Sequence, residues 1–232
     1  MQLNRDYSAV SNKIKQCLNL SGSPVAIKII TSKDQIPDGI NEIQEPARHC
    51  KMISLARNGD CFYATDSKHQ CGGGAWTLGL RQIGDKLKSG EHYYNLGKYG
   101  SIDSCIRTMN CIPHLPLSTY ATLYSPLESA KFTPNVVIIF ATPAIMLKLA
   151  QTLLYRLGGR IYPQFSGIQS FCSDLTAYVI LNGKANFSVG CDGSRKFSGI
   201  ANEEMAFGFP IEIIDEIADT LPIIVNGKGS SK

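Results

Sequence analysis

Four cysteines are the residues of this sequence whose type and placement best suit chemistry, and they form two pairs. Cys50 and Cys172 each open a stretch with helical spacing, and Cys71 and Cys191 each stand beside glycine in a loop. The helix dipole stabilises a thiolate at a helix start, and glycine lets backbone N–H groups approach a sulfur closely. Eight cysteines are many for a chain that is neither small nor loop-rich, so the pattern indicates metal or redox chemistry rather than a disulfide scaffold.

The two pairs lie in segments that match in order and spacing. Each segment contains a cysteine, a helical stretch, an Asn-Gly turn, an aromatic strand residue and a second cysteine, namely Cys50, Asn58-Gly59, Phe62 and Cys71, and then Cys172, Asn182-Gly183, Phe187 and Cys191. The cysteines are 21 residues apart in the first segment and 19 in the second. A structural duplication would bring equivalent positions together near a pseudo-two-fold axis, so that four thiolates converge. The alternative is that Asn-Gly is a common turn and that α/β chains resemble one another.

Four converging thiolates would suit a [4Fe–4S] cluster on Cys50, Cys71, Cys172 and Cys191. A zinc ribbon and a thioredoxin-like motif are disfavoured, because the chain contains no C-x2-C sequence. Two alternatives stay open at this point. The cysteines form a thiol–disulfide pair, Cys50–Cys71 or Cys172–Cys191, or they are buried core residues.

The glycines next to the loop cysteines suggest a second kind of site. Backbone N–H groups at Gly72, Gly73, Gly190 and Gly193 could hold an anionic small molecule or nucleotide. The lysine of a P-loop is absent, which disfavours nucleotide triphosphate hydrolysis. His49 and His69 adjoin two of the cysteines, and a lone histidine in a loop is more often solvated than a ligand.

The elements that must position these residues alternate between strand and helix. Apolar runs at 25–30, 61–65, 121–124, 135–140 and 187–189 indicate strands, and helical spacing falls at 6–20, 50–57, 101–109, 144–157, 172–180 and 211–221. We expect an α/β (or α+β) fold over residues 1–226, with two related halves at about 1–120 and 121–226. The Gly/Ser/Lys segment 227–232 should be a disordered tail.

Composition gives no support to several classes of function. The chain has 232 residues and a net charge of +4, and it lacks the basic stripe with interleaved aromatics that marks nucleic-acid binding. No apolar run approaches the roughly 18 residues of a membrane helix. The N-terminus lacks an apolar signal core, so we expect a cytoplasmic protein with neither membrane nor nucleic acid as partner. No catalytic set of residues stands out, and the sequence leaves a homo-oligomer open.

Several motifs resemble one known family. The matching stretches are Pro24-Val-Ala-Ile-Lys, Cys50-Lys-Met, Cys71-Gly-Gly-Gly-Ala, Tyr93-Tyr-Asn-Leu-Gly-Lys, Leu123-Tyr-Ser-Pro-Leu-Glu, Phe165-Ser-Gly-Ile-Gln and Gly190-Cys-Asp-Gly-Ser-Arg-Lys-Phe. They resemble the uncharacterised family known as domain of unknown function 169, which occurs in archaea and anaerobic bacteria. The resemblance implies that Cys50, Cys71, Cys172 and Cys191 belong to the family pattern, whereas Cys61, Cys105 and Cys111 do not. It implies no activity.

We therefore expect an iron–sulfur redox, electron-transfer or accessory protein that works with a redox partner. The first alternative is a small-molecule or nucleotide-binding protein that uses the glycine loops and keeps the cysteines in its core. The second is a thiol–disulfide switch.

Overall fold

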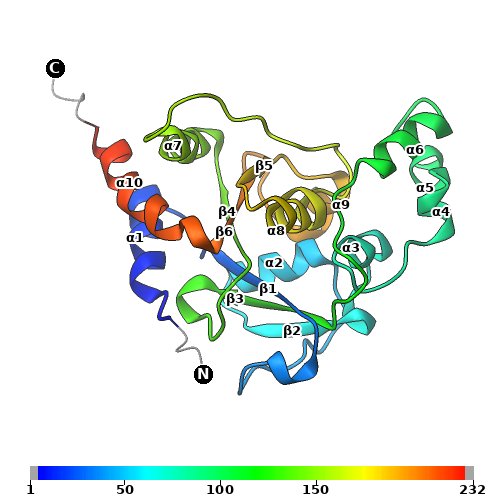
Figure 1. Ribbon diagram of the computed structural model, residues 1–232, viewed down its shortest axis with the longest axis horizontal. Coiled ribbons are helices and arrows are strands. Elements are labelled where there is room, and N and C mark those ends of the chain that lie inside the picture. The colour runs from blue at the N-terminus through cyan, green and yellow to red at the C-terminus, as the bar shows by residue number, and fades with distance from the viewer. Residues whose placement is uncertain (1–4, 228–232) are drawn as a thin grey trace.

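The centre of the computed structural model is a six-stranded sheet in the order β2-β3-β1-β4-β6-β5, and the structure describes residues 5–227 (Figure 1). Every neighbouring pair of strands is antiparallel. The strands are β1 (Val25–Ile30), β2 (Phe62–Thr65), β3 (Ala121–Pro126), β4 (Val136–Ala141), β5 (Asn186–Ser188) and β6 (Met205–Pro210). The mixture of helices with an antiparallel sheet confirms the predicted fold class in its α+β form.

The helices occupy the connections between these strands. The α-helices are α1 (Ser8–Leu18), α2 (His49–Arg57), α3 (Gly72–Thr77), α4 (Asp85–Lys88), α5 (Glu91–Asn95), α6 (Ile102–Asn110), α7 (Pro143–Leu154), α8 (Tyr178–Asn182), α9 (Asp192–Ser198) and α10 (Ile214–Asn226). A π-helix, η4 (Ser170–Ala177), runs directly into α8. Four short 3-10 turns are η1 (Lys33–Gln35), η2 (Asp66–Lys68), η3 (Leu127–Ser129) and η5 (Ile211–Ile213).

The sheet is covered on both faces, which explains why its central strands are continuous apolar runs rather than alternating ones. In β4, Val137 and Ile139 pack with α1, α7 and α10, whereas Val136 and Ile138 pack with α2, η4 and α8. All six residues of β3 and of β4 are buried. Figure 1 shows α1 and α10 together on one side and α2 and α8 on the other. Removal of this apolar area from water on both faces is the main contribution to stability.

The two halves of the chain occupy the sheet symmetrically. Strands β1 to β3, within residues 25–126, form the β2-β3-β1 side of the sheet, and β4 to β6, within residues 136–210, form the β4-β6-β5 side, so the order of strands reads the same from either edge. Strand β3 begins at Ala121, so the first three-stranded unit extends a few residues past the predicted boundary at about residue 120. The halves meet where β1 pairs with β4, through Val25 with Ile138, Ala26 with Val137 and Ile27 with Val136. The origin of this order in a duplication, and the half boundaries at about 1–120 and 121–226, stay predictions.

Three differences separate the structure from the sequence-based expectation. Helix α9 and strand β6 were not predicted, and the polar segment after Lys88 contains helix α5. The segment predicted as a helix at 172–180 begins as a π-helix. Of the tail predicted at 227–232, residues 228–232 lie outside the described residues. Within residues 5–227, no helix is both long and apolar enough to cross a membrane.

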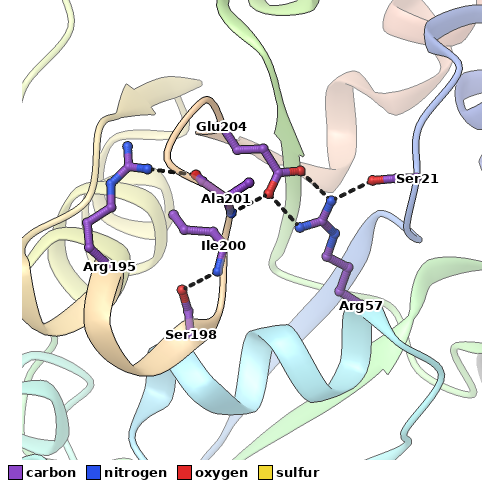
Figure 2. A network of polar contacts seen from close by, with 7 residues as sticks. All are labelled: Ser21, Arg57, Arg195, Ser198, Ile200, Ala201 and Glu204. Carbon is purple, nitrogen blue, oxygen red and sulfur yellow. Dashed lines mark hydrogen bonds and ion pairs between the residues drawn. The ribbon is translucent and has the colours of Figure 1, made fainter.

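One buried ion pair ties the two halves together beside the sheet (Figure 2). The guanidinium of Arg57, at the end of α2, donates to both carboxylate oxygens of Glu204 at 3.0 and 2.5 Å and to Ser21 Oγ at 2.9 Å. The Arg57 and Glu204 side chains are only 12% and 13% exposed. Glu204 also accepts from the backbone N–H of Ala201, which fixes the turn between α9 and β6. Arg57 lies 5.2 Å from the centre of the Phe140 ring, so its charge is satisfied on two sides.

We predict that Arg57→Ala destabilises the protein by about 3 kcal/mol, because it leaves the buried carboxylate of Glu204 without its partner. Urea unfolding followed by circular dichroism measures the loss. Lys13→Ala is the matched control, since its ion pair with Asp219 is exposed and should contribute less than about 1 kcal/mol. Equal losses in the two variants would contradict this account of the Arg57–Glu204 pair.

The same pair makes a prediction about pH. Hydrogen bonds from Arg57 hold the pKa of Glu204 below its usual value of 4.5. A carboxyl whose pKa is lowered by folding stabilises the folded state fully above its unfolded pKa, and this contribution disappears as the pH falls through the folded pKa. The stability difference between wild type and Arg57→Ala should therefore narrow below about pH 4.5. A difference that stays constant down to pH 3 would show that the ion pair is not its cause.

Candidate functional site

All four predicted cysteines line one pocket of about 460 Å³. Cys50 comes from α2 and Cys71 from the start of α3, both in the first half, while Cys172 comes from η4 and Cys191 from the start of α9. The other cysteines, Cys17, Cys61, Cys105 and Cys111, do not line it. The fold thus brings together four thiols that are up to 141 residues apart in the sequence.

Cys71 and Cys191 occupy the same local position in the two halves. Each is the N-cap of a short helix, and each sulfur accepts a hydrogen bond from the backbone N–H three residues on. The distances are 3.4 Å from Gly74 N to Cys71 Sγ and 3.4 Å from Ser194 N to Cys191 Sγ. A sulfur that caps a helix in this way is fixed in direction by the backbone, so both side chains are preorganised.

Gly74 and Gly193 lie beside these sulfurs with room for a Cβ at ordinary van der Waals distance. A Cβ on Gly74 would lie 3.7 Å from Cys71 Sγ and 3.9 Å from Cys172 Cβ, and one on Gly193 would lie 3.7 Å from Cys191 Sγ. Cys50 Sγ lies 3.9 Å from the carbonyl oxygen of Gly193, which brings the first half against the second.

The four glycines predicted to bind a cofactor are placed differently from one another. Gly193 lines the pocket, whereas Gly72 is exposed beside it. Gly73 is buried, and a Cβ there would lie 2.0 Å from Gln169 Nε2. Gly190 has φ of +83° and packs against Phe171. Gly74, the third glycine of the same Gly72-Gly73-Gly74 run, also lines the pocket.

Cys172 is carried by the π-helix η4, an arrangement that is rare and occurs most often at functional sites. The residue before η4, Gln169, is buried and has a left-handed backbone with φ of 52°, which is costly for a residue other than glycine. Its side-chain carbonyl accepts from Cys172 Sγ at 3.3 Å, and its amide donates to the Tyr93 hydroxyl at 2.7 Å. Gln169 therefore links the Cys172 thiol to the wall formed by α5.

The electrostatics of the thiols show how closely they share one environment. Burial, together with the neighbouring Cys191 and Cys71, raises the pKa of Cys50 to about 12. Burial raises the pKa of Cys172 well above its usual value, again with contributions from the other three thiols. For Cys191, burial raises the pKa, but hydrogen bonds from Ser170 and Ser194 outweigh it and the pKa is lowered. Because the neighbouring thiolates oppose ionisation of Cys50 and Cys172, a cation among them would favour the thiolate form of both.

A chain of buried hydrogen bonds lies behind the cysteines. His49 bonds Tyr124 Oη at 2.7 Å and Thr176 Oγ1 at 3.0 Å, and Thr122 Oγ1 bonds both Tyr124 Oη and His69 Nε2 at 3.0 Å. Burial lowers the pKa of each histidine to about 3. The expectation that His49 and His69 are solvated is therefore wrong. Side chains from the sheet and from η4 bury and satisfy them, and in this way brace the backbone next to Cys50 and Cys71.

The lining residues differ in exposure from one end of the pocket to the other. Cys172 is 8% exposed, and Gln169, Ser170 and Ser194 are also buried. These four residues form the floor of the pocket. Leu96 is 55% exposed and Phe197 38%, and they mark a mouth. The charged residues Arg48, Lys98, Asp192 and Lys196 line the pocket too, and apart from the half-buried Arg48 they are exposed.

A single metal ion and an iron–sulfur cluster require different spacings of four thiolates. Among residues 5–227, no three His, Cys, Asp or Glu side chains are gathered so as to hold a metal ion. Thiolates around a single zinc lie about 3.8 Å apart, given Zn–S bonds of about 2.3 Å. In an iron–sulfur cluster each thiolate binds a different iron atom, so the four are held farther apart. Four thiols lining one pocket, with N–H donors to two of them, fit that group in kind and number.

Comparison with known proteins places the chain in a family. The sequence profile of the family described as uncharacterised ArCR proteins, domain of unknown function 169, matches residues 13–220. The chain belongs to this family. An uncharacterised protein of Methanocaldococcus jannaschii is 37% identical to the ArCR chain over 213 residues, which is 91% of each protein. No solved structure matches the ArCR chain. The family resemblance seen in the motifs is confirmed, and all four cysteines lie within the matched residues.

Sequence reasoning missed several residues of the pocket. Gln169, Tyr93 and Lys98 were not predicted as site residues, although they stand in two of the stretches that resemble the ArCR family. Arg48 and Lys196 each lie within five residues of a predicted cysteine. The sequence signal that could have identified Gln169 and Tyr93 is the family motif in which each stands. Neither residue belongs to a segment whose apolar spacing predicts a strand or helix.

Two adjacent glycines of α3, Gly72 and Gly73, allow a test of how closely Gln169 packs against the backbone at the floor of the pocket. We predict that Gly73→Ala destabilises the metal-free protein by about 1–3 kcal/mol, because the new Cβ would collide with the Gln169 amide. Gly72→Ala is the control, since no atom lies within 4 Å of its new Cβ and alanine favours a helix over glycine by about 1 kcal/mol. Urea unfolding of both variants measures the difference. If Gly73→Ala were as stable as Gly72→Ala, the close packing of Gln169 would be refuted.

Proposed function

We propose that this ArCR protein holds one [4Fe–4S] cluster on Cys50, Cys71, Cys172 and Cys191 and acts as an electron-transfer, redox or accessory protein. The observation that carries the proposal is that two thiols from each half line one pocket, while no other cysteine among the described residues does. When bound, such a cluster supplies one-electron transfer.

The backbone around the sulfurs supports the proposal. The N–H groups of Gly74 and Ser194 already donate to Cys71 and Cys191, and such bonds to ligand sulfurs tune the potential of a cluster. Gly74 and Gly193 leave space beside the sulfurs that a Cβ would fill. These residues orient two thiolates without any contribution from a metal.

The side chains on the floor support it as well. Gln169 fixes Cys172 through its carbonyl and is held in turn by Tyr93, so the most deeply buried thiol has a defined direction. Ser170 Oγ accepts from the Cys191 backbone N–H at 2.7 Å and bonds Ser194 Oγ at 2.9 Å. A polar shell of this kind around ligand thiolates is typical of metal centres.

The placement of the thiols bears on how a redox partner would reach them. Cys50, Cys71 and Cys191 are half-buried and the pocket opens to the surface, so a partner protein or small molecule could approach.

The cytoplasmic location and the redox partner stay predictions. The thiol–disulfide switch, with Cys50–Cys71 or Cys172–Cys191 as its pair, is the alternative that the same preparation tests by mass spectrometry after mild oxidation.

We predict that anaerobically purified protein contains about four iron and four acid-labile sulfide per chain, with a broad absorption near ~400 nm. Serine in place of Cys50, Cys71, Cys172 or Cys191 should abolish or strongly reduce iron content, because a hydroxyl is a poor ligand for this soft site. Cys61→Ser and Cys111→Ser are matched controls, since both residues are exposed and outside the pocket.

Two outcomes would overturn the proposal. One is folded, iron-free wild-type protein that also fails to take up iron and sulfide on anaerobic reconstitution. The other is iron binding that is lost equally in the Cys61→Ser control, which would indicate adventitious iron on surface thiols.

A further inference from the structure

The pocket extends beyond its cysteines. Its volume of about 460 Å³ lies within the roughly 300–1,000 Å³ that small-molecule sites occupy. The thiols belong to the buried and half-buried lining, whereas Leu96, Lys98 and Phe197 line the exposed mouth. A cluster bonded to the four thiols would leave this mouth for a second occupant.

The charges at the mouth are unbalanced. Arg48, Lys98 and Lys196 face one acid, Asp192. Lys98 forms an ion pair with Asp192, but both side chains are substantially exposed, and such pairs contribute little. Among residues 5–227, neither Arg48 nor Lys196 forms an ion pair with a carboxylate.

Two of these cations share one aromatic ring. The Arg48 guanidinium lies 4.0 Å from the centre of the Phe197 ring, and Lys196 Nζ lies 5.5 Å from it. Two like charges gathered on one ring repel each other, and an anion between them would remove that repulsion. The ring that holds them, together with Tyr93 and Leu96, presents apolar surface to the same opening.

We propose that the mouth of the pocket binds a small organic anion, a carboxylate or a phosphate monoester with an apolar or aromatic body, whose charged group is held by Arg48, Lys98 and Lys196. The body lies against Phe197, Leu96 and Tyr93. This inference deepens the proposed function, because it names a class of ligand for the same pocket. It rests on the proposed function only in taking the cluster to occupy the part of the pocket that the four cysteines line.

Phenyl phosphate, benzoate and benzyl alcohol test this assignment, because they share a ring and differ in the head group. Titration calorimetry on anaerobically purified protein of measured iron content should show binding of at least one anion and none of the alcohol. The tighter of the two anions identifies the head group as phosphate or carboxylate. Affinity should fall as salt is raised from about 50 to about 500 mM, since the mouth is exposed to solvent.

Variants locate the binding at the mouth. Lys98→Gln and Lys196→Gln should each lower the affinity for the anion by roughly tenfold or more, because each variant loses one charge-assisted hydrogen bond. Lys13→Gln on α1 is the control and should bind as wild type does, because Lys13 lies on a different element and does not line the pocket. Iron content and thermal unfolding of each variant show whether the site is otherwise intact.

The results separate this assignment from the cluster. Iron-loaded protein that binds neither anion, or binds both no better than benzyl alcohol, would overturn the anion site and leave the cluster proposal standing. Anion binding that both lysine variants leave unchanged would also overturn it. Iron-free protein whose anion binding depends on Lys98 and Lys196 would support the anion site while the cluster proposal fails.

Discussion

The pairing of β1 with β4 is the interaction on which the rest of this structure depends. Within the described residues it is the only strand pairing that joins the β2-β3-β1 unit to the β4-β6-β5 unit, and three residue pairs form it at the middle of the sheet. Because the two strands run antiparallel, α2 and η4 are brought to the same face of the sheet, where they pack in one apolar cluster. The four thiols line one pocket because this junction holds the two units together. Without it, Cys50 and Cys71 would be separated from Cys172 and Cys191.

Much of this frame could be predicted from the sequence, since most strands and long helices have plain apolar periodicity. Strand β6 was missed because Met-Ala-Phe-Gly-Phe-Pro contains glycine and proline, which usually argue against a strand, yet Gly208 is required where a Cβ would lie 2.8 Å from the Leu175 carbonyl oxygen. Helix α9 begins inside the Gly-Cys-Asp-Gly stretch, and its seven residues pack against α2. A helix this short depends on such tertiary packing, which the sequence does not reveal. The π-helix has no separate sequence pattern, because its apolar residues also satisfy α-helical spacing.

The site was predictable in part for the same reason. The order of elements around the cysteines is similar enough in the two halves for the convergence of Cys50, Cys71, Cys172 and Cys191 to be inferred from the sequence alone. The polar side chains around them are different, since Gln169, Tyr93 and Lys98 acquire their roles only through contacts across the fold. The burial of His49 and His69 could not be predicted, because a sequence does not reveal that Thr122, Tyr124 and Thr176 lie ready to bond them.

The connections after α3 and α9 differ greatly in length, spanning residues 78–120 in one half and 199–204 in the other. The long connection carries α4, α5 and α6, which project from the body in Figure 1, and it brings Tyr93, Leu96 and Lys98 to the pocket. The floor is thus made largely by elements that both halves possess, whereas Leu96 and Lys98 at the mouth come from an extension that one half alone contains. Such a division lets selection act on the two ends separately: the extension can change in length or sequence, and with it what is admitted, while the thiols stay where the sheet holds them.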